Sequence, residues 1–263
     1  MAKSMPSRDA PCVVQTAEQP RSWETGTRLA TIAYAPSCIL DPASRRPNGT
    51  WGGARNRADR ASVYLSRDAV MAMLEAAAFA ESIGLAFNRH WTVHYQMAGI
   101  AERDGAAFIG RLLSLVRKHV RRRGGELAAL WSRENGTGKG GHVHILLHTP
   151  AGVTLRNRTR TWIKAAGGRP MRRVTKVRTI GRTLTDGQSS GALHYANLEA
   201  VLAYLLKGAS AETGHELGLP RYGEGGPIIG KRCGVTQNIG PTARRSMEDE
   251  SCQRRYKPLS RNL

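Results

Sequence analysis

The sequence predicts an α+β fold, in which a central antiparallel sheet is flanked by helices. Segments with helical spacing of apolar residues follow one another along the chain with segments that alternate as strands do. Two of these strands are joined by a glycine-rich loop, which indicates a hairpin and therefore antiparallel pairing. The order helix, strand, helix, strand, strand, short helix, strand, helix is typical of helices packed on an antiparallel sheet.

The first predicted helix covers residues 66–84, with Ser66 as its N-cap. Residues 87–97 alternate as a strand, with Trp91 on one side and two histidines on the other. A second helix, with cations towards its C-terminal end, follows in residues 105–125. The remaining predicted elements are a strand at 126–135, its hairpin partner at 142–148, a short helix at 156–167, a strand at 171–181 and a helix at 192–209.

Composition divides the chain and limits its function. Residues 1–60 are predicted to be a basic, largely irregular arm, residues 61–215 the folded domain and residues 216–263 a basic tail. The net charge of +20 predicts a polyanionic partner, first of all nucleic acid. No apolar run is long enough to span a membrane and the N-terminus has no apolar signal region, so we expect a cytoplasmic protein with no membrane partner. The four cysteines are far apart and are predicted to be free thiols.

The stretch "NGTGKGGHVHILLH" (135–148) resembles a phosphate-binding loop at first sight. In such a loop a Ser or Thr follows the lysine and a helix begins there. Here Gly140 follows Lys139, and the next residues alternate as a strand. The glycines are therefore interpreted as a hairpin turn, with Lys139 at its tip free to contact a DNA phosphate.

The histidines after this turn indicate a metal site. In a strand, His142 and His144 lie on the same face, while the residues between and after them point into the core. A third ligand is expected across the hairpin, and Glu134 is placed for it; His148 is the weaker candidate. Two imidazoles and a carboxylate suit Mn²⁺, Mg²⁺ or Zn²⁺, and the residues alone do not choose among these ions. The alternative is that the His-x-His pair belongs to packing or to the surface.

The last predicted helix carries a candidate nucleophile. Tyr204 and Lys207 are three residues apart and therefore neighbours on one helical face. A tyrosine hydroxyl needs a nearby cation, base or activated electrophile to act as a nucleophile, and Lys207 could supply that cation or donate a proton to a leaving oxygen. Tyr195 lies about half a turn out of phase, so we expect it to face away.

Taken in order, the strand "HWTVHY", the strand "HVH" and the helical Tyr-x-x-Lys resemble the three motifs of HUH endonucleases, specifically the single-tyrosine rolling-circle replication initiators of plasmids and phages. The resemblance covers roughly residues 86–210 and implies an RRM-like core. It implies that His142, His144 and Glu134 bind a divalent metal, with Mn²⁺ or Mg²⁺ the first expectation. It also implies that Tyr204 attacks single-stranded DNA to give a 5′-phosphotyrosine and a free 3′-OH, with the assistance of Lys207.

The basic residues and the family resemblance together predict the partners. Residues 156–182 contain no acid, and we expect Arg172, Arg173, Lys176 and Arg178 to contact the DNA backbone together with Lys139. Single-stranded DNA or an origin hairpin is the expected substrate. Because the sequence has no Walker motif, a host helicase and a host polymerase are the expected protein partners. The alternatives are a relative that acts in transposition or mobilisation, and a non-catalytic nucleic-acid-binding or regulatory protein.

Overall fold

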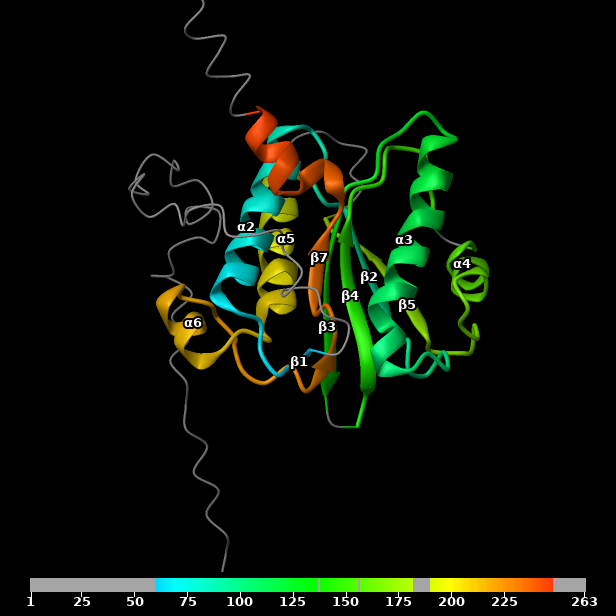
Figure 1. Cartoon of the computed structure of the whole chain (residues 1–263). Coiled ribbons are helices and arrows are strands. Elements are labelled where there is room, and N and C mark those ends of the chain that lie inside the picture. Colours follow the sequence, from blue (N-terminus) through cyan, green and yellow to red (C-terminus); the bar gives the residue numbers. More distant parts are fainter. Residues whose placement is uncertain (1–59, 137, 156, 182–189, 248–263) are drawn as a thin grey trace, which may run out of the picture.

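A five-stranded antiparallel sheet in the order β5-β2-β4-β3-β7 forms the centre of the fold (Figure 1). The structure is a computed structural model that describes residues 60–136, 138–155, 157–181 and 190–247. The strands of the sheet are β2 (Arg89–Val93), β3 (Ala129–Gly136), β4 (Gly140–Leu147), β5 (Thr175–Thr179) and β7 (Cys233–Val235). A separate two-stranded sheet pairs β1 (Ala61–Ser62) with β6 (Ile228–Ile229). The prediction of an α+β fold around a central antiparallel sheet is confirmed.

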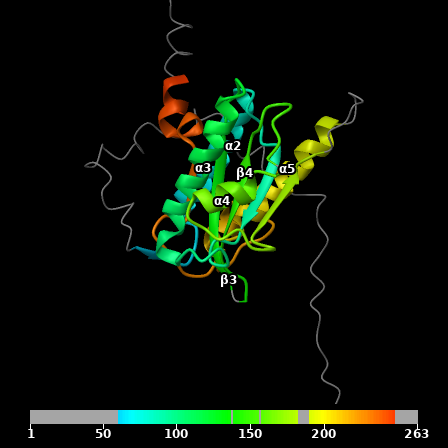
Figure 2. The ribbon, with the colours of Figure 1, turned by 90° about the vertical axis from the view of Figure 1, so that its right-hand side faces the viewer.

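Helices cover both faces of this sheet, as Figures 1 and 2 show. One face packs against α2 (Arg67–Ser82) and α5 (Ser190–Leu206), and the other against α3 (Gly105–Arg121) and α4 (Thr159–Ala165). Short helical segments complete the described chain: η3 (Glu102–Asp104), α6 (Ala211–Glu216) and η4 (Gln237–Ile239). The sheet therefore separates two hydrophobic cores.

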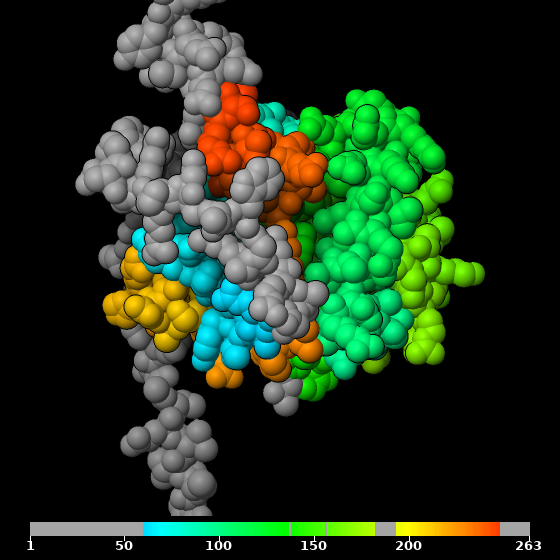
Figure 3. Space-filling model, in the orientation of Figure 1, coloured from blue at the N-terminus to red at the C-terminus, as the bar shows by residue number. Residues whose placement is uncertain are grey.

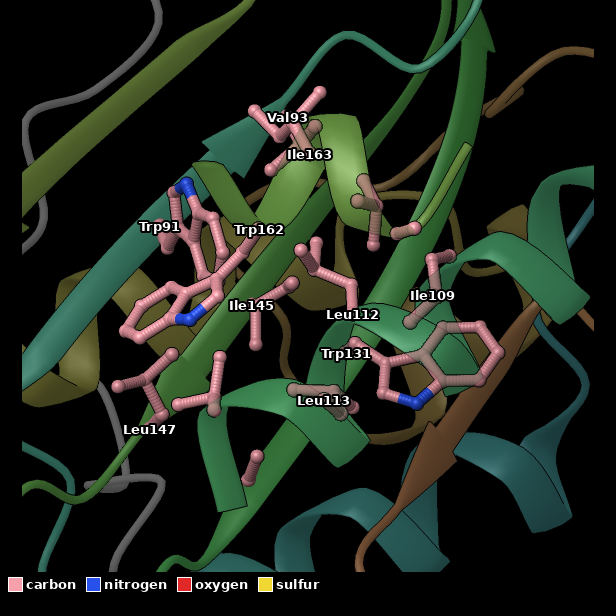
Figure 4. Packing of buried hydrophobic residues seen from close by; sticks show 14 of the residues in the cluster. Trp91, Val93, Ile109, Leu112, Leu113, Trp131, Ile145, Leu147, Trp162 and Ile163 are labelled. Atoms are coloured by element: carbon pink, nitrogen blue, oxygen red, sulfur yellow. The ribbon is translucent and has the colours of Figure 1, made fainter. Parts of the chain in front are cut away.

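The alternation of β4 assigns its residues to these two cores. Val143, Ile145 and Leu147 are fully buried with α3 and α4 in the core that Figure 4 shows. His142, His144 and Leu146 point to the opposite face, where Leu146 packs in the core under α2 and α5. Because three apolar residues anchor one side of the strand, the two histidines are held rigidly on the other.

Several predicted elements match the structure closely. Ser66 caps α2, with its hydroxyl accepting a hydrogen bond from the amide of Ala69 at 3.3 Å. The predicted hairpin forms between β3 and β4. Trp131 and Trp162 are both buried in the core beside α3.

The segment predicted as a tail, 216–263, contributes to the sheet in its described part. β7 pairs with β3, and the amide of Arg133 donates to the carbonyl of Arg232 at 2.7 Å just beyond the ladder. A strand of three residues with a central glycine has too few side chains to show alternation, so its pattern gives no strand signal. The predicted N-terminal arm, residues 1–60, lies outside the described residues except for Arg60.

Arg133 is a fully buried charge that ties three segments together on the α3 side of the sheet. Its guanidinium pairs with Glu102 at 2.5 Å and donates to the carbonyls of Ile229 and Lys231 at 2.9 and 3.0 Å. It also donates to the hydroxyl of Tyr95 at 3.3 Å. The neighbouring residue, Glu134, points to the opposite face, so this network fixes the backbone from which Glu134 projects.

Candidate metal centre

The β3–β4 hairpin brings Glu134 and the two histidines of β4 together. In its register Glu134 lies directly opposite His142, and Ser132 lies opposite His144. One ligand atom from each of Glu134, His142 and His144 lies within 4.8 Å of the other two. Each of these residues is only 4% exposed. The fold thus places a buried carboxylate and two imidazoles at one point on the α5 side of the sheet.

Glycines at the hairpin end determine where His142 sits. Gly140 has a φ of +64°, which favours glycine. A Cβ on Gly141 would lie 2.6 Å from Oε2 of Glu102 and 2.7 Å from the ring of Tyr95. The amide of Gly141 donates to the side-chain carbonyl of Gln96 at 2.6 Å. The glycines therefore form a turn that packs closely against its neighbours.

Hydrogen bonds orient both imidazoles. Nδ1 of His142 donates to the carbonyl of Gly140 at 2.9 Å, and Nε2 of the same ring faces Oε2 of Glu134 at 3.5 Å. Nδ1 of His144 lies 3.1 Å from the hydroxyl of Thr92 and 3.3 Å from Nε2 of His90. Contacts of this kind to the remote ring nitrogen fix the orientation of metal-binding histidines.

Two buried atoms at the centre lack hydrogen-bond partners. They are Nε2 of His144 and Oε1 of Glu134. Burying an unpaired polar atom is costly, and a divalent cation bound between them would satisfy both. Ligand atoms of a tetrahedral site lie about 3.4 Å apart, so small side-chain rotations bring the three groups to one ion. Glu134, His142 and His144 could therefore hold a metal ion.

The charges of the centre suit metal binding. Burial raises the pKa of Glu134, but hydrogen bonds from His142 and Lys207 and the charge of Lys207 outweigh it and bring the pKa to about 2. Burial lowers the pKa of His144 to about 3, against the opposing effect of Glu134. At neutral pH the carboxylate is therefore ionised and the His144 imidazole is neutral, which are the forms that coordinate metals.

The two predicted catalytic residues lie beside this centre, Tyr204 on α5 and Lys207 directly after its last residue. The ring of Tyr204 makes an edge contact with the ring of His144, with 4.8 Å between the centroids. Lys207 forms an ion pair with Glu134, and its Nζ lies 4.8 Å from the centroid of the Tyr204 ring. Tyr195 lies nine residues before Tyr204 on the same helix. It is 52% exposed and does not line the cavity over the centre.

A cavity of about 760 Å³ opens over the centre. His142, His144 and Tyr204 line it, and no described residue of its lining is acidic. Four of the five cations predicted to bind DNA line it as well: Lys139, Arg173, Lys176 and Arg178. Arg172 is exposed and is not part of the lining. Glu134 and Lys207 are not part of the lining, although Glu134 is grouped with His142 and His144.

The site also contains residues to which the sequence analysis assigned no role. His90 and His94, the two histidines that the alternation of residues 87–97 places on one side, both line the cavity. Burial lowers the pKa of His90 to about 4, and the charge of Arg178 lowers it further.

The sequence analysis did not identify Thr92, which contacts His144, or Gln96, which accepts from the amide of Gly141. The alternation of the strand "HWTVHY" places Thr92 on the histidine face and is the pattern that could have indicated it. His148 is held by the carbonyl of Ala86 at 2.8 Å and is not part of the metal group.

Two further observations bear on the class of protein. Among the described residues, no helix combines the length and the apolar character that crossing a membrane requires. The chain is an α+β protein with an antiparallel sheet and a buried His-x-His and glutamate triad. No protein-family model, curated protein or solved structure matches it.

Proposed function

We propose that this chain is a metal-dependent nickase of the HUH type, which cleaves and rejoins single-stranded DNA through Tyr204 and thereby starts rolling-circle replication. The observation that carries the proposal is the contact between Tyr204 and His144. A candidate nucleophile and a candidate metal ligand touch each other and line one cavity. The basic wall of that cavity suits a polyanionic substrate.

The proposed cleavage follows from these positions. A DNA phosphate binds between the wall formed by Lys139, Arg173, Lys176 and Arg178 and the hydroxyl of Tyr204. The tyrosine oxygen loses its proton and attacks phosphorus, the bond from phosphorus to the 3′ oxygen breaks, and that oxygen takes up a proton. When bound by Glu134, His142 and His144, a divalent metal such as Mn²⁺ or Mg²⁺ polarises the phosphate and offsets its developing charge.

Lys207 contacts both a candidate metal ligand, Glu134, and the proposed nucleophile, Tyr204. Its ion pair with Glu134 favours the ionised carboxylate and fixes its orientation. Its position over the Tyr204 ring places a positive charge beside the proposed nucleophile.

The covalent product explains rejoining without nucleotide hydrolysis. The 5′-phosphotyrosine keeps a phosphoester bond, so a 3′-OH can attack it and release Tyr204. A replication initiator that works in this way needs unwinding and synthesis from other proteins, and a host helicase and polymerase are the proposed partners. Transposition and mobilisation use the same chemistry, and the identity of the cleaved DNA decides among these roles.

The experiment incubates the full chain with Mn²⁺ and a library of single-stranded oligonucleotides labelled at the 3′ end. A 5′-phosphotyrosine carries the 3′ label into a protein adduct that survives denaturation, whereas a 5′ label leaves on a shortened strand. Tyr204→Phe should abolish the adduct. Tyr195→Phe, on the same helix but outside the cavity, should retain it. DNA binding with no adduct from the wild type, or an equal adduct from Tyr204→Phe, contradicts the proposal and favours a non-catalytic binding protein.

A further inference from the structure

The face of the sheet opposite the Tyr204 cavity carries a second concentration of positive charge. Helix α3 and the two residues after it present six exposed cations: Arg111, Arg117, Lys118, Arg121, Arg122 and Arg123. Helix α4, packed beside it, adds exposed cations at Arg158, Arg160 and Lys164. Neither residues 105–125 nor residues 150–185 contain an acid. We call these nine cations the α3–α4 surface; Figure 3 shows α3 in green along the outside of the molecule.

Cations from the two helices lie close enough to act on the same group. Burial lowers the pKa of His119, on α3, and the charges of Arg123, Arg158 and Arg122 lower it further. Arg111 donates from Nε to the carbonyl of Ala166 at 2.9 Å, which joins the two helices directly. Cations of both helices therefore meet where α3 and α4 pack together.

No carboxylate within the described chain neutralises the α3–α4 surface. The ion pairs found among the described residues include none of its nine cations. One or two cations near the C-terminal end of a helix are favoured by its dipole. Nine cations on one surface, however, repel one another. Such a surface is stabilised when a polyanion binds to it.

The chemistry of the surface distinguishes among polyanions. Of the large hydrophobic side chains exposed in the described residues, none lies on α3 or α4. The aromatic rings of this layer, Phe108 and Trp162, are buried. Proteins that bind single strands stack bases on exposed aromatic rings, and helices that bind membranes insert an apolar face. The α3–α4 surface offers only charge on a rigid scaffold, which suits the outward-facing phosphates of a double helix.

We propose that the α3–α4 surface binds the phosphate backbone of double-stranded DNA. α3 has 17 residues and is therefore about 25 Å long. A double helix carries one phosphate charge per about 1.7 Å of its axis, so several phosphates lie within that length. Contacts of this kind position DNA without reading its sequence.

Exposed cations connect the α3–α4 surface with the Tyr204 cavity. The role that we assign to them rests on the proposed function. The element after α4 in the chain is β5, which is an edge strand of the sheet (Figure 1). Arg169 and Arg172 are exposed between them, and Arg173 then lines the cavity. A strand that leaves a duplex on the α3–α4 surface would follow these cations over the β5 edge to Tyr204. The surface would thus hold the duplex that flanks the cleaved strand.

The experiment compares the full chain with a triple variant, Arg117→Gln, Arg121→Gln and Arg122→Gln. All three side chains are exposed, so the variant should fold. A matched control, Arg60→Gln, Arg221→Gln and Arg245→Gln, removes three exposed cations from other parts of the fold. Fluorescence anisotropy measures binding to a labelled duplex of about 30 base pairs and to a single strand of the same length over a range of salt concentrations.

The triple variant should lose at least about tenfold in duplex affinity, and its plot of log K against log salt should become shallower by about 0.9 for each phosphate that the protein no longer neutralises. Single-strand affinity should change much less, and the control should keep both affinities. Unchanged duplex affinity, an equal loss for single strands, or a preference for RNA duplexes would each overturn the inference. If the wild type forms no Tyr204 adduct while the triple variant still loses duplex affinity, the proposed function fails and the duplex-binding surface stands.

Discussion

Lys207 and Glu134 form an ion pair that crosses from the end of α5 to β3, and the paired oxygen is Oε2, the carboxylate atom nearest His142. A metal ion bound at Oε1, the oxygen that has no hydrogen-bond partner, would share this carboxylate. The ammonium group and a divalent cation therefore compete for it and repel each other. The lysine would therefore lower the affinity of the centre for a metal ion.

We predict that Lys207→Met increases Mn²⁺ affinity about tenfold, which corresponds to about 1.4 kcal/mol, because it removes the competing cation. Isothermal titration calorimetry measures the change. Lys231→Met is the matched control, because Lys231 also lies over an aromatic ring, that of Trp131 on the opposite face of the sheet, at 5.7 Å. Weaker binding by Lys207→Met would instead show that Lys207 serves chiefly to orient Glu134.

Gly141 tests whether the hairpin turn positions the metal ligands. An alanine there would place its Cβ 2.6 Å from Glu102 and 2.7 Å from the ring of Tyr95, which is fully buried. We expect Gly141→Ala to lower the free energy of unfolding by about 1–3 kcal/mol, as overpacking does, and to weaken Mn²⁺ binding through displacement of His142. Urea denaturation and calorimetry measure the two effects. Gly136→Ala is the control, since a Cβ there meets nothing within 4 Å; equal effects at both positions would contradict the argument.

Much of the centre could be predicted from the sequence because local patterns encode it. The alternation around "HVH" puts His142 and His144 on one face, and a glycine turn between two strands brings Glu134 across from them. Tyr204 and Lys207 share a helical face at a spacing of three. These relationships depend on neighbours in the chain, so periodicity and turn chemistry are enough to find them.

The remaining relationships depend on contacts that no local pattern records. Lys207 and Glu134 are separated by 73 positions, and their pairing follows from how α5 packs on the sheet. Arg133 is charged, and charged side chains in a strand usually face solvent. It is nevertheless buried, because Glu102, Ile229 and Lys231 supply its partners from other segments. β7 is too short to show a period.

Metal binding should stabilise the fold through residues of the centre alone. Mn²⁺ at 100 times its dissociation constant should raise the free energy of unfolding by about 2.7 kcal/mol and the melting temperature by about 5–10 °C. Calorimetric scans with Mn²⁺ and after chelation measure the difference within each variant, so any effect of a substitution on folding cancels. His144→Ala should lose the shift. His148→Ala should keep it, because His148 is bound to the carbonyl of Ala86. A shift that survives in His144→Ala would place the ion elsewhere.

Arg173 combines a strained backbone with a position in the cavity wall. Its φ is +67°, a conformation that costs a residue with a Cβ about 1–2 kcal/mol. Arg173→Gly relieves this strain, so we expect the variant to be more stable by about 1 kcal/mol and to melt about 2–4 °C higher.

The same substitution removes a cation from the wall of the cavity, and we expect single-strand affinity to fall about tenfold, as the loss of one charged phosphate contact would give. Asn157→Gly is the control: Asn157 has the same φ of +67° but is exposed and outside the cavity, so its affinity should not change. A protein that becomes more stable and binds DNA less well would show that the strained backbone is kept for the contact that Arg173 makes. If Arg173→Gly gains stability and binds as tightly as the wild type, Arg173 is not a DNA contact.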